Sequence, residues 1–392
     1  MRKQGWTYKK LGEVCKIARG GSPRPIKNYI TTSSDGLNWI KIGDTDPQGK
    51  YIFSTKEKIR KEGLKKTRWV EENEFLLSNS MSFGRPYILK TNGCIHDGWL
   101  VLRDYQDSLF IDFFYYLLIS PFVQKQFKIK AQGSTVSNLN TDRVTNIDIT
   151  FPSLEEQERI VARLDAAFAQ IDELRANAEK QLEEARALFN AALNEEMKPK
   201  KGWEEKTVGD IFKTYSGGTP IKSNKSYYEN GNIPWIRSGE VCKRFITESE
   251  LFITEEGLKN SSAKFYPIDT VLIAMYGATA AQVGILKFPA TSNQAVCGIL
   301  PNKNYLPDFV YFWFKHIEEQ LASQAQGGAQ PNISQEKIKR VLIPFISLSE
   351  QEAIVERLDG LSERVKELEE IARTTVKECD ALKQAILRET FE

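Results

Sequence analysis

The sequence lacks the features of a secreted or membrane-spanning protein. No stretch approaches the roughly 18 consecutive apolar residues of a membrane span, and no apolar segment follows residues 1–6, so we expect no secretory signal. The five cysteines are odd in number and scattered without a Cys-x-x-Cys pair, and only two histidines are present to help hold a metal. This pattern indicates reduced thiols, a cytoplasmic protein and no zinc site.

Motifs of the common catalytic sites are also missing. The sequence contains no Gly-x-x-x-x-Gly-Lys-Ser/Thr phosphate loop and no Gly-x-Gly-x-x-Gly at the start of a helix after a strand. Pro307-Asp308 is not followed by the Asp/Glu-x-Lys of a metal-dependent nuclease. His96 and His316 leave a Ser/His/Asp or Cys/His site open in one part of the chain, although no flanking motif favours it. We therefore expect a protein that is not an enzyme and that binds neither a metal ion nor a cofactor.

What the sequence does contain is the same pattern twice, in residues 6–197 and 203–392. The matching pieces are Gly5-Trp6 and Gly202-Trp203, Gly20-Gly21-Ser22-Pro23 and Gly217-Gly218-Thr219-Pro220, and Trp39-Ile40-Lys41 and Trp235-Ile236-Arg237. Each copy closes on a signature that contains Glu-Gln, in residues 153–165 and 347–359. A repeat of nearly half the chain far exceeds the roughly 20 to 50 residues of a solenoid repeat, so it predicts two similar domains with a pseudo-two-fold relation. The glycine pairs, each followed by a proline, predict turns.

Two long acidic helices are the clearest structural prediction. Residues 153–198 contain no proline or glycine and are rich in Ala, Leu, Glu and Arg, and residues 347–392 are similar with a single glycine. Apolar residues recur with alternating steps of three and four, which is a heptad seam. The seam residues are Val161, Leu164, Phe168, Ile171, Leu182 and Phe189 in the first helix and Val355, Leu358, Val365, Leu368, Leu382 and Ile386 in the second. Neither helix can bury so long a stripe against its own domain, so we expect the two to pair as a coiled coil. A strut with no further task would also account for the seam.

The remaining segments predict two mixed domains. Residues 74–77 and 269–273 are apolar runs of strand length, whereas residues 109–127 and 308–321 carry apolar and aromatic side chains at helical spacing that is typical of a core. We therefore predict an α+β fold. Its globular domains would be residues 1–152 and 198–346, and its spacer helices residues 153–197 and 347–392, with the first boundary in the proline- and lysine-containing stretch 197–202.

The net charge of +2 conceals an uneven distribution. Residues 154–196 contain 11 acidic and 5 basic side chains, and residues 348–392 contain 12 acidic and 7 basic ones. The rest of the chain therefore carries 42 Lys and Arg against 29 Asp and Glu. Basic domains of this kind attract polyanions by long-range field and by counterion release, although solvated surface lysines and arginines that only keep the domains soluble account for the composition equally well.

The motifs together resemble the specificity subunit of type I restriction-modification systems. The resemblance lies in the Gly-Gly-Ser/Thr-Pro and Trp-Ile-Lys/Arg pieces, in a late polar turn at residues 133–140 and 327–334, and in the closing Glu-Gln-x-x-Ile-Val-x-x-Leu-Asp signature. It covers essentially the whole chain, in the order domain, helix, domain, helix.

This resemblance implies that each globular domain reads one half of a split target in double-stranded DNA, while the two helices pair antiparallel and set the gap between the halves. Because the cores of the two copies differ, the target would be asymmetric. The resemblance also implies a non-catalytic chain on which two modification subunits dock, which bind S-adenosylmethionine and methylate adenine. Restriction subunits, which act as translocase and endonuclease with ATP and Mg²⁺, would join for cleavage.

Base edges and phosphates call for Arg, Lys, Asn, Gln, Ser or Thr side chains in loops. In the first copy we select Arg19, Arg24, Lys27, Lys41, Lys65, Lys66, Arg68, Ser80, Ser82 and Arg85. In the second copy we select Lys222, Lys225, Arg237, Lys243, Arg244, Lys259, Lys264, Tyr276 and Thr279. Each of these residues could equally be a solvated surface residue with no role in binding. Lys41 and Arg237 share a position in the repeat, so we expect them to have a common structural role or to contact phosphates. Two other functions stay open: a tandem DNA-binding protein that acts alone, and a coiled-coil adaptor that binds proteins.

Overall fold

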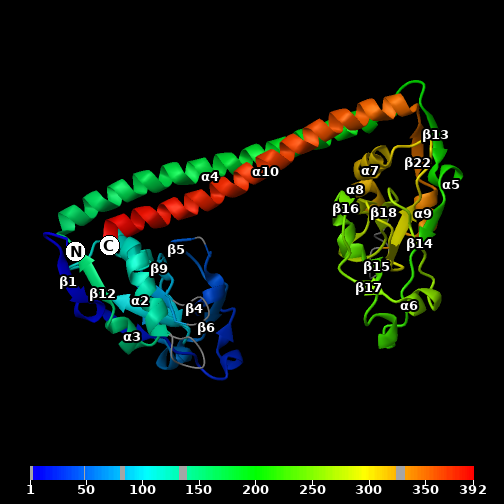
Figure 1. The fold of residues 1–392 in the computed structure, drawn as a ribbon. Coiled ribbons are helices and arrows are strands. Elements are labelled where there is room, and N and C mark those ends of the chain that lie inside the picture. The colour runs from blue at the N-terminus through cyan, green and yellow to red at the C-terminus, as the bar shows by residue number, and fades with distance from the viewer. Residues whose placement is uncertain (1–2, 48, 80–83, 132–138, 324–331) are drawn as a thin grey trace. The chain divides into compact units, whose positions relative to one another are not determined.

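The computed structural model describes residues 3–47, 49–79, 84–131, 139–323 and 332–392, and these form a mixed fold of helices and small sheets (Figure 1). The chain divides into two compact units, which we call unit 1 (residues 1–178 and 373–392) and unit 2 (residues 179–372). The border between them falls inside both long helices. The sequence had placed its domain borders at the helix ends instead, and the difference arises because each stretch of helix packs on the globular part nearest to it.

The described residues of unit 1 form three sheets. Its strands are β1 (Thr7–Lys10), β2 (Lys16–Arg19), β3 (Ile30–Thr31), β4 (Leu37–Ile40), β5 (Tyr51–Ile52), β6 (Glu57–Ile59), β7 (Arg68–Val70), β8 (Phe75–Ser78), β9 (Pro86–Leu89), β10 (Gly93–Ile95), β11 (Trp99–Arg103) and β12 (Asp148–Phe151). They are ordered β2-β11-β8-β9-β5, β3-β6-β4-β10-β7 and β1-β12. The helices are α1 (Ile111–Ile119), α2 (Pro121–Ala131) and α3 (Thr141–Thr145).

Unit 2 repeats this plan with a smaller second sheet among its described residues. Its strands are β13 (Glu204–Thr207), β14 (Thr214–Ser216), β15 (Ile233–Ile236), β16 (Phe245–Ile246), β17 (Phe252–Ile253), β18 (Val271–Ala274), β19 (Val283–Leu286), β20 (Thr291–Ser292), β21 (Val296–Ile299) and β22 (Leu342–Phe345). Their orders are β14-β21-β18-β19-β16, β17-β15-β20 and β13-β22. The helices are α5 (Val208–Ile211), α6 (Glu255–Lys259), α7 (Pro307–His316), α8 (Glu318–Ser323) and α9 (Gln335–Lys339).

The internal repeat is therefore visible in the topology. In the sheet β2-β11-β8-β9-β5 of unit 1 and the sheet β14-β21-β18-β19-β16 of unit 2, the last strand runs parallel to its neighbour while the other neighbours are antiparallel. In the second sheet β10 lies parallel to β4, as β20 does to β15. The predicted α+β class is confirmed. The helical spacing of residues 109–127 corresponds to two helices, because Pro121 favours extended geometry at the preceding Ser120 and separates α1 from α2.

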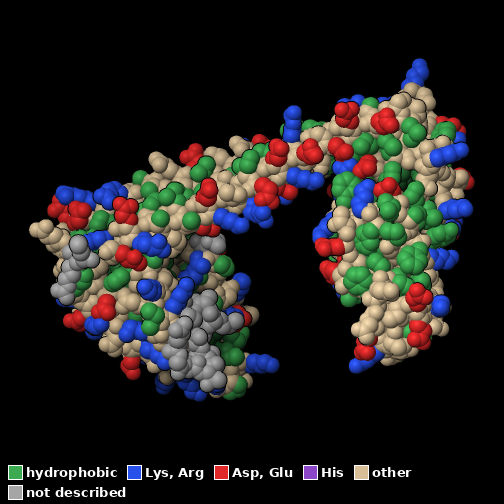
Figure 2. Space-filling view, in the orientation of Figure 1, with side chains coloured by type: hydrophobic (Ala, Val, Ile, Leu, Met, Phe, Trp, Pro, Cys, Tyr) green, Lys and Arg blue, Asp and Glu red, His purple; other side chains and the backbone are tan. Residues whose placement is uncertain are grey.

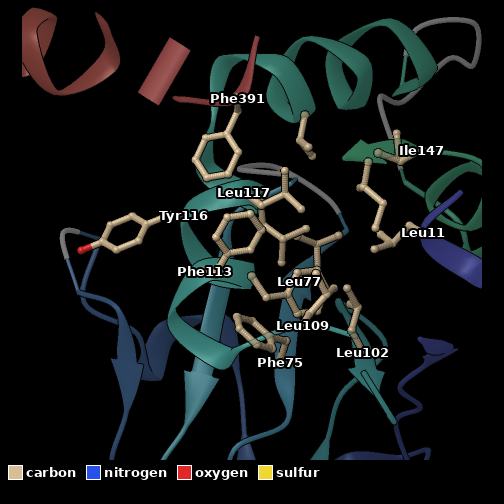
Figure 3. Packing of buried hydrophobic residues seen from close by; sticks show 14 of the residues in the cluster. Leu11, Phe75, Leu77, Leu102, Leu109, Phe113, Tyr116, Leu117, Ile147 and Phe391 are labelled. Atoms are coloured by element: carbon tan, nitrogen blue, oxygen red, sulfur yellow. The ribbon is translucent and has the colours of Figure 1, made fainter. Parts of the chain in front are cut away.

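The core of unit 1 lies between α1 and the β8-β11 sheet. Figure 3 shows Phe113 and Leu117 of α1 above Phe75 and Leu77 of the sheet, and all four are fully buried. Phe391, near the C-terminus, reaches the same cluster with its ring centre 5.3 Å from that of Phe113. The end of the second long helix is therefore part of the unit 1 core, and the aromatic stripe is packing, as its spacing indicates.

The two long helices are α4 (Leu154–Met197) and α10 (Leu348–Phe391), and they lie side by side (Figure 1). Ion pairs join Asp172 to Lys383 and Arg175 to Asp380 in unit 1, and Arg186 to Glu369 and Glu196 to Arg357 in unit 2. Residue numbers rise along α4 while their partners fall along α10, so the pairing is antiparallel. Positive and negative side chains accordingly lie next to each other along both helices (Figure 2). Each exposed pair contributes at most about 1 kcal/mol, so apolar contact dominates the pairing.

The predicted seam holds over most of its length and fails near the end of α10. Val161, Leu164, Phe168, Ile171 and Leu358 are buried, and Leu182, Phe189, Val355, Val365, Leu368 and Ile386 are half-buried. Leu382 was assigned wrongly, since 49% of its surface is exposed. After buried Cys379 the helix instead presents Lys383, whose Nζ lies 5.4 Å from the ring centre of Phe168, and then buried Leu387. The residue that follows Cys379 on the packed face is therefore four positions later and not three, because the last turns of α10 pack on the unit 1 core.

A buried glutamine explains the Glu-Gln signature. Gln157 has no exposed surface; its Oε1 accepts from the Phe110 amide at 2.8 Å, and its Nε2 donates to the carbonyl oxygens of Ser108 (2.9 Å) and Pro152 (3.0 Å). Equally buried Gln351 makes the corresponding bonds in unit 2, with Leu306, Asn304 and Ile346. In each unit this side chain fixes the first turn of the long helix to the loop that precedes α1 or α7.

Candidate nucleic-acid interface

The Gly-Gly pair of unit 1 leaves β2 as extended chain and not as the predicted turn. The Gly20 amide donates to the Trp99 carbonyl at 2.9 Å. A Cβ on Gly20 would lie 2.2 Å from the His96 carbonyl oxygen, and one on Gly21 would lie 2.8 Å from that of Lys66. The turn prediction was wrong because both glycines are wedged between two other backbone segments, where no side chain fits.

Unit 2 has the same close approach. The Gly217 amide donates to the Val296 carbonyl at 3.0 Å and the Gly218 amide to that of Ser292 at 2.9 Å. A Cβ on Gly218 would lie 2.2 Å from the Ala263 nitrogen. The glycines thus set the course of the Ser/Thr-Pro segment that follows them in both units.

In unit 1 this course brings the segment against the loop between β10 and β11. The Ser22 hydroxyl donates to Asp97 Oδ1 at 2.6 Å, and this bond holds the pKa of the Asp97 carboxyl below its usual range. The Asp97 carbonyl accepts from Arg19 Nε at 3.0 Å and from the side-chain Nδ2 of Asn79 at 2.8 Å. The Arg24 guanidinium lies 3.5 Å from the other carboxylate oxygen. Arg19, Arg24 and the Asp97 carboxylate therefore lie together at this loop. The loop backbone is held by bonds to the Asp97 carbonyl, which do not involve the carboxylate.

An open groove of about 960 Å³ lies beside this loop, lined by Arg24, Lys27, Lys41, His96 and Asp97 among others. Burial lowers the pKa of His96, so this imidazole is neutral near pH 7 and the cationic charge of the groove comes from its lysines and arginine. The lining also holds two carboxylates, Glu57, which is paired with Lys41, and Asp97. A groove with a cationic rim and an exposed carboxylate is suited to a ligand that carries both anionic and hydrogen-bond-donor groups.

The structure brings some unit 1 candidates together and separates others. Arg19, Arg24, Lys27 and Arg68 are exposed around the groove and its loop, and Arg68 Nε donates to the Arg19 carbonyl at 2.8 Å. Lys41 lies in the groove but is paired with Glu57 at 2.6 Å.

The other unit 1 candidates lie apart from the groove lining. Lys65 and Lys66 are exposed at the end of the short 3-10 helix η4 (Lys61–Lys66), where Lys66 Nζ donates to the Tyr29 hydroxyl at 2.9 Å. Arg85 is half-buried, with its guanidinium carbon 5.5 Å from the Tyr87 ring centre. Ser80 and Ser82 lie outside the described residues.

Most unit 2 candidates are exposed. They are Lys222, Lys225, Arg237, Lys243, Lys259, Lys264 and Tyr276, with Thr279 half-buried. Arg237 is engaged by Glu250 and lies 3.7 Å from Glu240, and Lys264 Nζ lies 4.9 Å from the Tyr215 ring centre.

Arg244 is corrected by the structure. Only 13% of its side chain is exposed; it bonds to Asp308 at 2.5 Å and also to Asp359, and its guanidinium carbon lies 4.7 Å from the Phe312 ring centre. Because both arms of the guanidinium are engaged inside the unit, Arg244 ties the start of β16 to α7 and α10 and is not available to DNA.

Sequence reasoning missed two residues that lie on equivalent loops of the two units. Asp97 has an equivalent in Gln294, which follows β20 as Asp97 follows β10, and Thr219 donates to Gln294 as Ser22 does to Asp97. No motif marks these two positions, because the residue types differ between the copies. Among the described residues, no group of three or more His, Cys, Asp or Glu is placed to hold a metal ion, and no helix is long and apolar enough to cross a membrane.

Comparison with known families decides the relationship. The family described as "Type I restriction modification DNA specificity domain" matches residues 3–184 and again residues 200–377. The chain belongs to this family. The resemblance noted in the motifs is thereby confirmed, and the two matches coincide with the two copies of the repeat.

Individual members of this specificity family are similar over different lengths. The chain is 33% identical over 213 residues to the EcoR124I/EcoR124II specificity subunit of Escherichia coli, a match that spans 53% of this chain and 52%, about half, of that relative. It is 27% identical over 372 residues to the MjaIX specificity subunit of Methanocaldococcus jannaschii, covering 86% of this chain and 83% of that one.

Solved structures agree on the fold. A chain from a structure titled as the basis of complex assembly and conformational transition of the type I R-M system superposes with a TM-score of 0.79, at 22% identity and with 98% of this chain and 97% of that one covered. The HsdS subunit from Thermoanaerobacter tengcongensis gives 0.59, at 21% identity and with coverage of 99% and 97%.

Proposed function

We propose that this chain is the non-catalytic specificity subunit of a type I restriction-modification complex, in which each unit reads one half of an asymmetric, bipartite target in double-stranded DNA. One observation supports this above the others. The two units share strand order and the glycine-wedged loop, but they present different polar side chains at equivalent places on that loop. A common scaffold with different exposed groups is what recognition of two unlike sequences requires.

Membership of the family supports a proposal for the partners. Two modification subunits, which bind S-adenosylmethionine and methylate adenine, would dock on the chain, and restriction subunits using ATP and Mg²⁺ would join them. The paired acidic helices suit this division of labour, since their negative charge disfavours contact with phosphates whereas the basic excess lies outside them. S-adenosylmethionine, ATP and Mg²⁺ belong to the partner subunits in this proposal.

The test is to co-express the chain with an adenine methyltransferase subunit encoded beside it and to select DNA from a randomised duplex library with the purified complex. The expected result is a complex of one copy of this chain with two methyltransferase subunits that enriches two different short sequences at a fixed spacing. Specific, tight binding by the chain alone would instead indicate a protein that acts without partners. A complex that binds DNA without sequence preference and without salt dependence would indicate a protein adaptor.

A further inference from the structure

Asp97 and Gln294 occupy the same place in the two units. In unit 1, Ile95 of β10 pairs with Ile40 of β4, and Asp97 follows two residues later. In unit 2, Ser292 of β20 pairs with Ile236 of β15, and Gln294 again follows two residues later. The register of two parallel strand pairs therefore places the two side chains on equivalent loops.

The Gly-Gly-Ser/Thr-Pro motif supports both side chains in the same way. The Ser22 hydroxyl donates to the Asp97 carboxylate in unit 1, and the Thr219 hydroxyl donates to the Gln294 side-chain oxygen in unit 2. Because the glycines fix the backbone before Ser22 and Thr219, each hydroxyl arrives at a set position. The motif thus orients one variable polar side chain per unit.

Each supported side chain keeps hydrogen-bonding capacity to spare. The Asp97 side chain is 42% exposed, and among the described residues its second carboxylate oxygen has only the long 3.5 Å contact with Arg24. Gln294 is exposed, and the described part of the chain supplies no acceptor for its amide nitrogen. A carboxylate can only accept hydrogen bonds, whereas an amide accepts and donates, so the two units offer different chemistry at one position.

The surroundings suit a nucleic acid and not a free cation or anion. Arg24 and Lys27 border Asp97 and are exposed, as are Lys222 and Lys225 after the Thr219-Pro220 segment of unit 2. A carboxylate among such cations weakens attraction for phosphate, so its exposure is explained by a partner that donates hydrogen bonds. In the major groove, Asp accepts from the N4 amino group of cytosine, and Gln forms a two-bond contact with N6 and N7 of adenine.

We infer that Asp97 and Gln294 are the equivalent specificity-determining residues of the two units, with Asp97 reading a cytosine in one half-site and Gln294 reading an adenine in the other. The inference rests on the proposed function and assigns residues to it. Ser22 and Thr219 are positioning residues that act through these side chains.

The experiment uses the complete complex with its methyltransferase subunits and measures base preference at every position of both half-sites by selection and sequencing. Asp97→Gln is expected to reduce the preference for cytosine at one base pair of one half-site by about 5- to 150-fold, in favour of adenine. Gln294→Glu is expected to make the reverse change at one base pair of the other half-site. Ser22→Ala is expected to relax the same position as Asp97→Gln, and Ser22→Thr, which copies unit 2, is expected to restore it.

Matched controls carry the same change of charge elsewhere. Asp148→Asn on β12 and Gln320→Glu on α8 alter exposed residues away from the loop and are expected to leave both half-sites unchanged. Folding of the Asp97 variant is protected because Arg19 and Asn79 hold the unit 1 loop through the Asp97 carbonyl and not through its side chain.

Two results would overturn the inference in distinguishable ways. A wild-type complex with clear half-sites, whose Asp97 and Gln294 variants lose affinity equally for all sequences, would make these residues structural or electrostatic and leave the proposed function standing. A wild-type complex with no sequence preference would remove the proposed function and the assignment together.

Discussion

Replacing Gln157 by Met keeps the size of the buried side chain and removes its three hydrogen bonds. The Phe110 amide then loses its acceptor, and the carbonyls of Ser108 and Pro152 lose a donor. An unpaired buried group costs about 1–3 kcal/mol, and carbonyls with a second lone pair recover part of this, so we expect unit 1 to lose about 3 kcal/mol of unfolding free energy.

This loss has two measurable consequences. For a unit of nearly two hundred residues it lowers the midpoint of thermal unfolding by about 6–12 °C. If the Phe110 loop opens locally, its amides exchange with solvent about 100-fold faster, since 1.4 kcal/mol corresponds to a factor of about ten. Hydrogen exchange read by mass spectrometry on peptides that cover residues 106–112 measures the second effect and identifies the affected unit.

The control is Gln170→Met, an exposed position on the same helix that we expect to change stability by less than about 0.5 kcal/mol. Gln351→Met should reproduce the Gln157→Met effect in unit 2 and leave exchange in unit 1 unchanged. The change of about 0.5 kcal/mol allowed for the control corresponds to a shift of at most about 2 °C in the unfolding midpoint. If the midpoint of Gln157→Met lies within about 2 °C of wild type, the buried glutamine does not anchor the helix.

Three further outcomes are expected. Leu387→Ala should destabilise the chain by about 2–4 kcal/mol in denaturant unfolding and Leu382→Ala by less than about 1 kcal/mol, and equal effects would contradict the corrected seam. Charge reversal at Lys65 and Lys66 should weaken DNA binding by the assembled complex and reduce the slope of log affinity against log salt by about 0.9 for each phosphate that is no longer neutralised, so an unchanged slope would exclude both lysines as phosphate ligands. Iodoacetamide should modify Cys242 alone in the native chain, because the other thiols are buried, and mass mapping of a second modified cysteine would refute this.

The sequence was a good guide wherever one periodicity or one repeated motif controls the structure. The long helices, their pairing and the duplication follow from proline-free heptads and from matching motifs at equal spacing. The end of α10 was mispredicted because Leu382 obeys the heptad, while the position of Leu387 is decided by a core that lies far away in the sequence. Local patterns carry no information about such a distant contact.

The candidate site was harder to predict for a related reason. Lysines and arginines were selected by type and by loop position, which does not distinguish an exposed cation from a buried one such as Arg244. The glycine pairs were recognised, but the backbone they approach comes from residues far along the chain. Asp97 and Gln294 were not predicted because the search looked for residues that are the same in both copies. Residues that recognise two different DNA sequences must differ between the copies, so such a search does not find them.

The anchoring of the long helices shows the same contrast between shared geometry and changed chemistry. In unit 2, Arg244 bridges Asp308 of α7 and Asp359 of α10. In unit 1, Lys50 before β5 pairs with Asp112 of α1 at 2.5 Å, and Asp165 of α4 instead accepts from the Tyr116 hydroxyl of α1. An ammonium offers a compact point charge and a guanidinium a two-armed fork, so a lysine needs a second donor to engage both carboxylates. In each unit the aspartate of the closing Leu-Asp therefore accepts a hydrogen bond that holds the long helix to the globular part. The residue that donates this bond differs between the units.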